Sequence, residues 1–211
     1  MKSSVLAVLL CFAVMGFTAQ AQDNQYVGAD KCKNCHSAAT KGDPYGHWLK
    51  SSHAKAYETL ASEASKKIAA EKKIADPQKD EGCLSCHTTA AGLPATAKSK
   101  KFDLTKGVQC ESCHGPGGNH VKARLAVEIP ADGKMLQVGP NEIKNVETTA
   151  TCTVCHNEKS PTYKPFDFKA RLKEIAHFDP RRNHPADYAD KLAESIEKAS
   201  KKEDAPKTEQ K

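Results

Sequence analysis

The sequence Cys32-Lys33-Asn34-Cys35-His36 sets a pattern that the chain repeats at residues 83–87, 110–114 and 152–156. In every copy two cysteines flank two other residues, and a histidine follows the second cysteine directly. This is the pattern at which c-type haem is attached. The thiols form covalent bonds to the haem, and the histidine becomes an axial ligand of its iron. The pattern therefore predicts four covalently bound haem c groups.

Two sets of side chains carry this prediction. The predicted attachment residues are Cys32, Cys35, Cys83, Cys86, Cys110, Cys113, Cys152 and Cys155. The predicted proximal iron ligands are His36, His87, His114 and His156. Zinc binding and disulfide formation are the alternatives for paired cysteines. A zinc site needs two thiol pairs that converge on one metal, and a histidine fixed after every pair adds nothing to it.

The N-terminal segment has the features of a secretory signal. An apolar run from Val5 to Phe17 is followed by Ala19-Gln20-Ala21, which has small residues at the two positions that a signal peptidase reads. Cleavage after Ala21 removes Cys11, so the four motifs use every cysteine of the mature chain. We therefore expect residues 1–21 to be a cleaved signal peptide and the mature protein to be periplasmic or extracellular. No integral membrane segment is expected after cleavage.

The rest of the chain is expected to form one domain, residues 22–197, which contains all four motifs. Residues 198–211 are charged and lack large apolar side chains, which predicts a disordered tail. Aromatic residues make up only 6% of the sequence, so an ordinary hydrophobic core would be thin. Four large apolar macrocycles would then supply most of the interior.

The formal net charge of +6 would by itself suggest nucleic acid or an anionic surface as a partner. Four haems change that sum, because each brings two propionates against one positive charge per ferric centre. The oxidised protein is then close to neutral. The net charge then no longer supports nucleic-acid binding, and the expected partners are redox proteins, an electron donor and an acceptor. Both a monomer and an oligomer remain open for this protein.

Helical spacing places several elements along the chain. Asp43-Pro44 predicts a helix start, and apolar residues from Leu49 to Ala64 follow at helical spacing, which puts His53 on the buried face. A pause is expected near Ser62. Further helices are predicted from His120 to Leu125 with Asn119 as the cap, from Phe168 to His177, and from Pro185 with Tyr188, Leu192 and Ile196 along one stripe; residues 88–107 and 130–146 are predicted loops.

Each iron needs a second axial ligand, and histidine is the expected choice. Five histidines lie outside the motifs, whereas Met135 is the one methionine left after signal cleavage. Paired histidine ligands lower the reduction potential relative to a histidine and a methionine. The favoured candidates are His53, His120 and His177, and the weaker ones are His47 and His184.

Three stretches resemble the tetrahaem cytochrome c-554 family: Cys-Glu-Ser-Cys-His-Gly-Pro-Gly at 110–117, Trp48 to Ala56, and Tyr163-Lys-Pro-Phe166. The resemblance runs from about Gly28 to His177. It implies a mainly α-helical fold with porphyrins stacked in pairs. It also implies a distal His120 on the first haem, His177 on the third and His53 on the fourth, with a five-coordinate second haem on His87 shielded by residues 163–166.

The chain departs from this family pattern in two respects. Its loops are shorter, notably between His114 and His120, and it has His47 and His184, either of which could occupy the sixth position on the second haem. Kinship of fold does not fix the redox partners, so hydroxylamine oxidoreductase, the partner of the best-known member, does not follow for this chain.

The sequence as a whole predicts a mainly α fold with little or no sheet, in which helices and long loops wrap around four covalent haems. The leading functional interpretation is an electron-transfer protein that relays single electrons, without enzymatic activity of its own. One alternative is reduction of nitric oxide or a related nitrogen oxide at a five-coordinate haem on His87. The other is a subunit of an extracellular cytochrome filament, in which a spare histidine ligates an iron of the next molecule.

Overall fold

The computed structural model describes residues 24–128, 130, 136–146, 148–182 and 184–203. The expected signal peptide, Met135 and residues 204–211 of the expected tail lie outside the described residues. The elements, in chain order, are α1 (Ala29–His36), η1 (Ala39–Lys41), α2 (Pro44–Lys50), α3 (Ala56–Thr59), α4 (Glu63–Glu71), α5 (Glu81–His87), η2 (Ala95–Ala97), η3 (Leu104–Lys106), α6 (Cys110–His114), α7 (Gly118–Leu125), α8 (Ala150–Thr153), α9 (Phe168–Ile175), η4 (Pro180–Arg182) and α10 (Tyr188–Glu203).

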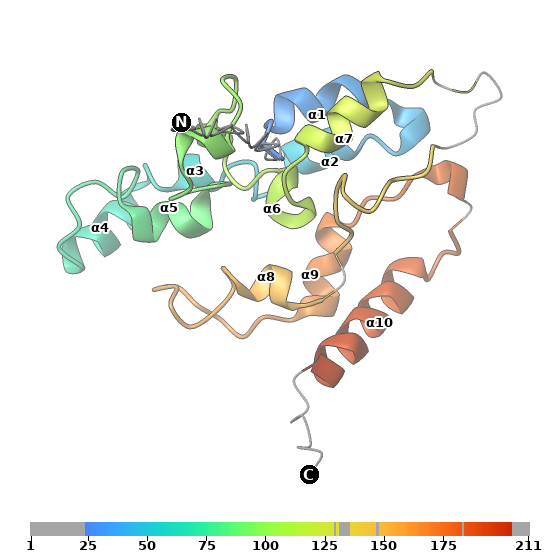
Figure 1. Cartoon of the computed structure of the whole chain (residues 1–211). Helices are drawn as coiled ribbons and strands as arrows, with labels where there is room; N and C mark the ends of the chain where they lie inside the picture. The colour runs from blue at the N-terminus through green and yellow to red at the C-terminus, as the bar shows by residue number, and fades with distance from the viewer. Residues whose placement is uncertain (1–23, 129, 131–135, 147, 183, 204–211) are drawn as a thin grey trace, which may run out of the picture.

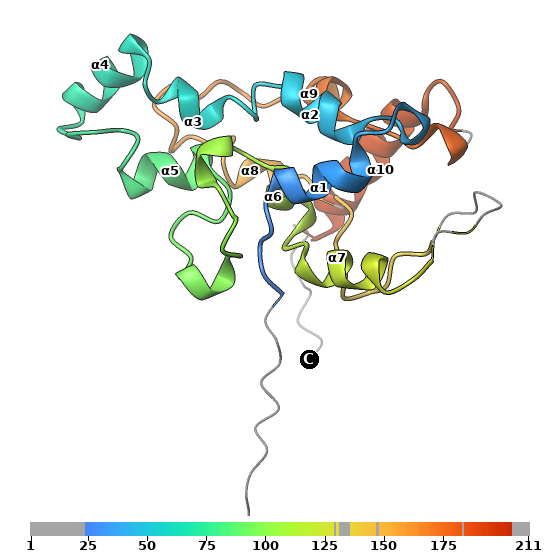
Figure 2. The same cartoon turned by 90° about the horizontal axis from the view of Figure 1, so that it is seen from above.

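The predicted mainly α class is confirmed. The described residues contain no strand, and an isolated parallel bridge pairs Tyr26 with Lys98. Most helices are short and are joined by long loops (Figure 1). Helices α3, α4 and α5 form one end of the molecule, α1, α2 and α7 form the other, and α6 lies between them, as the view from above also shows (Figure 2).

The continuous helix predicted from Asp43 to the pause near Ser62 is wrong, because the chain leaves the helix between Lys50 and Ala56. The pause itself is confirmed, since α3 ends at Thr59 and α4 begins at Glu63. Asp43 caps α2 as expected by accepting the N–H of Gly46, but α2 ends at Lys50 and Ser51 is extended. His53 therefore lies in a turn, not on a helix face. Its carbonyl accepts the N–H of Val108, a contact that a continuous helix could not make.

Gly107 allows the two segments to approach this closely. Its φ is +76°, in the region that favours glycine. A Cβ at this position would lie 2.5 Å from the carbonyl oxygen of His53. The indole of Trp48 reinforces the contact by donating to the carbonyl of Val108 at 2.8 Å. These long-range contacts, absent from any local pattern, decide where the helix ends.

The expected start of the helix after the third motif also needs correction. Helix α7 begins at Gly118, and Asn119 lies inside its first turn instead of capping it. The N–H of Gly117 donates to Glu111 at 2.7 Å, and the N–H of Asn119 donates to Asn24 at 2.7 Å. Side chains outside the helix, one from the preceding α6 and one from the N-terminal segment, thus accept the free N–H groups that a local cap would have accepted.

The C-terminal helices α9 and α10 pack against each other around a hydrophobic cluster. Its buried members are Phe168, Leu172, Ala193 and Ile196. Two lysines of α9 support the contact, Lys169 with Glu194 and Lys173 with Asp190, both at 2.7 Å. The predicted amphipathic stripe is therefore the packed face of α10. The helix extends to Glu203, past the boundary at residue 197 that composition predicted.

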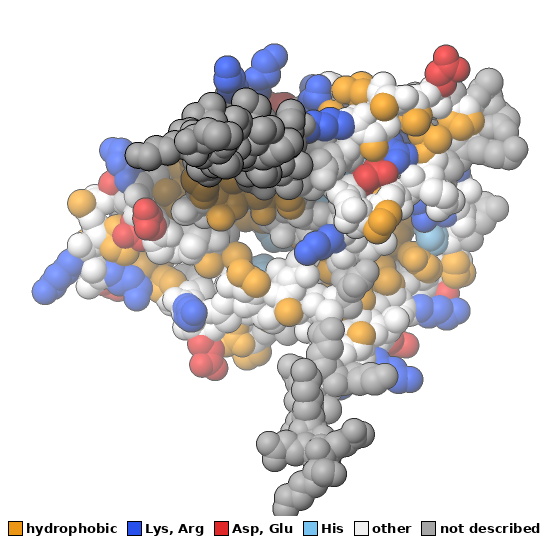
Figure 3. All heavy atoms as spheres, in the orientation of Figure 1, with side chains coloured by type: hydrophobic (Ala, Val, Ile, Leu, Met, Phe, Trp, Pro, Cys, Tyr) orange, Lys and Arg blue, Asp and Glu red, His pale blue; other side chains and the backbone are white. Residues whose placement is uncertain are grey.

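The hydrophobic core formed by the polypeptide is small. Among the described residues, its buried apolar members are Ala29, Tyr45, Leu60, Ala69, Phe168, Leu172, Ala193 and Ile196. Leu49, which the helical spacing placed on a buried face, is 52% exposed, because α2 ends one residue later. Hydrophobic side chains also spread over the face shown in Figure 3. No helix in the described part of the chain is long and apolar enough to cross a membrane.

Candidate functional site

Each of the four motifs lies on or directly after a short helix. Helices α1, α5 and α6 end at the motif histidines His36, His87 and His114, whereas His156 follows shortly after α8. Asp80 fixes the start of α5 by accepting the N–H of Cys83 at 2.9 Å. Residues three apart lie on the same face of a helix, so this geometry turns both thiols of a motif to one side.

The structure brings histidines from distant segments together in pairs. The ring centroids are 6.1 Å apart for His36 with His120, for His114 with His177, and for His53 with His156. Two imidazoles on opposite sides of one metal have centroids about 6 Å apart, given metal–nitrogen bonds of about 2 Å. The three pairs therefore fit a metal held between two histidines, the arrangement expected for an axially ligated haem iron.

Hydrogen bonds fix the orientation of four histidine rings, His87 and three members of the pairs. Nδ1 of His87 lies 2.7 Å from the carbonyl oxygen of Ala56, and Nδ1 of His114 lies 2.8 Å from that of Lys144. The corresponding partners are Ile175 O for His177, at 3.1 Å, and the carboxylate of Glu142 for His120, at 2.8 Å. An oxygen acceptor requires the proton to be on Nδ1, which leaves the lone pair of Nε2 free for a metal.

Electrostatics favours the form of histidine that binds metals. Burial lowers the pKa of His53 and His177, and the neighbouring His156 and His114 lower them further by charge repulsion. Burial likewise lowers the pKa of His36 and His156. These rings are therefore neutral near pH 7, and a neutral imidazole is the ligand for iron. Histidine atoms are visible inside a hollow near the middle of the face in Figure 3.

Thiols of different motifs lie next to one another. The thiol of Cys110 lies beside that of Cys32, and its interaction, together with burial, raises the pKa of Cys32. Burial raises the pKa of Cys155 to about 12, with further contributions from Cys86. Burial also raises the pKa of Cys113 to about 11, with a contribution from Cys152 of the fourth motif. The motifs are thus adjacent in the order first, third, fourth, second.

The two spare histidines have other neighbours. The ring of His47 lies 6.2 Å from that of His177, and its Nε2 is 3.2 Å from the carbonyl oxygen of Glu174. His184 stacks on Tyr188 at 3.9 Å and lies 5.3 Å from Phe178. His47 therefore belongs with the third motif in space, and His184 belongs to an aromatic cluster at the start of α10.

The loop that the family resemblance placed over the second motif contacts the fourth. Phe166 stacks on His156 with ring centroids 4.5 Å apart and an angle of 19°. It also packs against the cluster between α9 and α10. Sequence reasoning did not identify Phe166 as a neighbour of His156, nor Glu142 as the partner of His120. Both lie in segments without periodicity, where no pattern could have indicated their contacts.

Comparisons with known proteins agree with these features. The family model described as "Cytochrome c554 and c-prime" matches residues 31–115, which include the first three motifs. Cytochrome c-554 of Nitrosomonas europaea is 32% identical over 200 residues, which cover 85% of this chain and 82% of that relative. No solved structure matches the chain significantly.

Proposed function

The chain belongs to the cytochrome c-554 family, and from this premise we propose that it is an exported tetrahaem cytochrome that relays single electrons between redox proteins. Family membership makes it a c-type cytochrome with covalently bound haem and a role in electron transport. The number of four haems, the axial ligands and the periplasmic location are our proposal. They are supported by four complete motifs and by the apolar segment that precedes Ala21.

The proposed ligand sets follow from the histidine pairs. His36 with His120 would hold the first haem, His114 with His177 the third, and His156 with His53 the fourth. The observation that carries this proposal is the separation of 6.1 Å in all three pairs, each of which joins a motif histidine to one from a distant segment. Bound haem supplies a one-electron Fe(III)/Fe(II) couple.

The polypeptide would supply the axial ligands of the irons, bury the haems and set the order in which they lie. Neutral histidines on both sides of an iron favour low potentials. The hydrogen bonds from Nδ1 to fixed oxygens hold the rings in place and make them more basic ligands. The contacts between thiols of neighbouring motifs give the four sites a continuous order, as a relay of electrons requires.

Spectroscopy of the purified, exported protein tests this proposal. Mass spectrometry should find four haems on the eight cysteines, and electron paramagnetic resonance of the ferric protein should show three low-spin irons. His53→Ala should convert one of them to high spin. The matched control His184→Ala, in the aromatic cluster, should leave all signals unchanged. Bare thiols, or a low-spin count unaffected by His53→Ala, would contradict the proposal.

A second candidate is reduction of nitric oxide or a related nitrogen oxide at the haem on His87. It is favoured by the positions of the spare histidines, because His47 lies beside His177 and His184 stacks on Tyr188. His87 itself is held by the carbonyl oxygen of Ala56. A high-spin ferric signal that shifts when nitric oxide is added would support this candidate, and a fourth low-spin signal in its place would exclude it.

A further inference from the structure

We propose that Glu142 is a positioning residue that lowers the reduction potential of the haem held by His36 and His120, through its hydrogen bond to His120. This inference rests on the proposed ligation of the first haem by these two histidines. It assigns a role to a residue outside every motif, in the loop that follows α7.

The contact between Glu142 and His120 is short and sheltered. Oε2 of Glu142 lies 2.8 Å from Nδ1 of His120, and the two side chains are 12% and 16% exposed. The ring of His120 faces that of His36 at a centroid separation of 6.1 Å. The carboxylate therefore binds Nδ1 of His120. In the proposed ligation, the other ring nitrogen, Nε2, would hold the iron.

A carboxylate is a different acceptor from those at the other motif sites. His87, His114 and His177 have the carbonyl oxygens of Ala56, Lys144 and Ile175 beside Nδ1. A hydrogen bond to an ionised acceptor is roughly twice as strong as one between neutral groups. It draws the proton further from Nδ1 and makes the imidazole a more basic ligand, which stabilises Fe(III) over Fe(II).

Other contacts keep the carboxylate ionised and aimed at His120. Oε1 of Glu142 accepts the N–H of Gly139 at 2.8 Å and a guanidinium N–H of Arg124 at 2.6 Å. Arg124 lies four residues after His120, on the same face of α7, so a single helix turn presents both groups to the carboxylate.

The test is a redox titration of the holoprotein carrying Glu142→Gln, which keeps the shape of the side chain and removes its charge. We expect one haem to become easier to reduce. At a fixed solution potential its ratio of reduced to oxidised form should rise about tenfold, which corresponds to an increase of about 59 mV in its reduction potential. The control Glu128→Gln removes the same charge from an exposed side chain near the end of α7 and should shift no haem by as much. Glu142→Asp, which keeps the anion, should recover part of the shift.

The outcomes separate this inference from the function on which it rests. Four unchanged potentials in Glu142→Gln, or an equal shift in Glu128→Gln, would overturn the role of Glu142. If Glu142→Gln loses a low-spin signal, Glu142→Asp decides: a native low-spin signal with a potential below that of Glu142→Gln supports the role, and a potential as high as that of Glu142→Gln overturns it. Failure of the proposed ligation shows separately, as a low-spin count that His120→Ala leaves unchanged.

Discussion

Glu111, inside the third motif, is predicted to be the residue whose loss destabilises the fold most. Its side chain is only 3% exposed, and its carboxylate accepts three backbone N–H groups. These come from Val27 and Gly28, both at 2.8 Å, and from Gly117, at 2.7 Å. One side chain thus ties the segment before α1 and the start of α7 to the helix that carries Cys110 and Cys113.

The size of the effect follows from these three bonds. Glu111→Ala would leave each donor without its acceptor, at a cost of about 1–3 kcal/mol per buried group, or about 3–9 kcal/mol in total. The variant also removes a buried charge, whose desolvation costs several kcal/mol in the native protein, so part of that loss is offset. We expect Glu111→Ala to lower the free energy of unfolding by about 3 kcal/mol.

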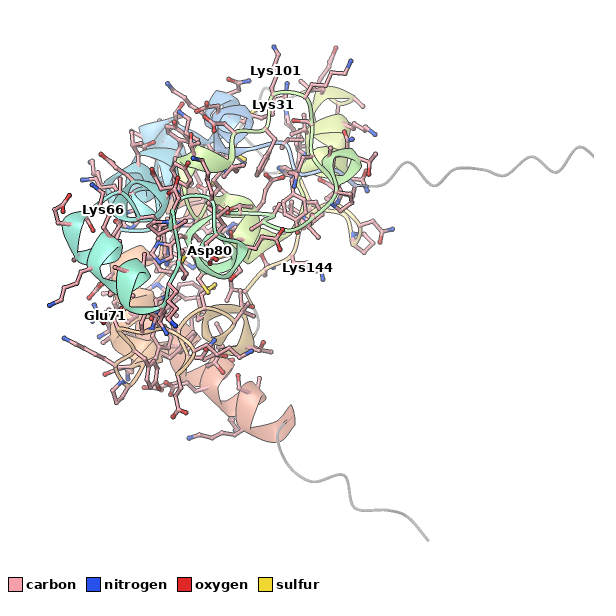
Figure 4. All side chains as sticks on the ribbon, turned by 90° about the vertical axis from the view of Figure 1, so that its left-hand side faces the viewer. Lys31, Lys66, Glu71, Asp80, Lys101 and Lys144 are labelled. Carbon is pink, nitrogen blue, oxygen red and sulfur yellow. The ribbon has the colours of Figure 1, made fainter. Side chains whose placement is uncertain are left out.

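Guanidinium unfolding of the holoprotein, followed by far-UV circular dichroism, measures this loss. The matched control is Glu71→Ala at the C-terminal end of α4, where the side chain is exposed (labelled in Figure 4). Hydrogen exchange should locate the effect, with faster exchange at the amides of Val27, Gly28 and Gly117. A free energy for Glu111→Ala within about 0.5 kcal/mol of that for Glu71→Ala would refute the reasoning.

Two further changes have predictable directions. Gly107→Ala should destabilise the protein by about 1–3 kcal/mol, because φ is +76° and the added Cβ meets the carbonyl of His53. The midpoint of guanidinium unfolding measures this loss. Arg181 holds the pKa of Asp179 at about 2, below the ordinary 3.8, so the ionised carboxylate stabilises the fold above pH 3.8 and this contribution is lost as pH falls toward 2. Asp179→Asn should flatten the acid unfolding profile in that window; a profile identical to that of wild type would contradict this.

The helical class and the two C-terminal helices could be predicted because they depend on local patterns. Asp43 caps α2, Ser62 caps α4, and Leu192 and Ile196 lie on the packed side of α10, each as its neighbours in sequence indicate. The interruption after Lys50 could not be predicted, because it depends on the approach of residues 107–108, far away in the sequence. Apolar spacing alone favours a continuous helix there.

The candidate site divides in the same way. The motif histidines are defined by their position after each cysteine pair, and counting the remaining histidines limits their possible partners. The spacing of residues could not show that His47 lies beside His177, or that Phe166 stacks on His156. It also could not supply the oxygen acceptors at Nδ1, since three of them are backbone carbonyls and a carbonyl has no sequence signature.

These acceptors connect the folding of the chain to the properties of the proposed haem sites. The bond from His87 to Ala56 is part of the packing of α5 against α3, and the bond from His114 to Lys144 holds the loop after α7 against α6. Because the same contacts fold the polypeptide and orient its ligands, a change to such a carbonyl would alter stability and ligation together. A side-chain acceptor such as Glu142 differs from a carbonyl, because Glu142→Gln changes its charge and leaves the backbone unchanged. Under the proposed role of Glu142, this is where a potential can be adjusted with the smallest change to the fold.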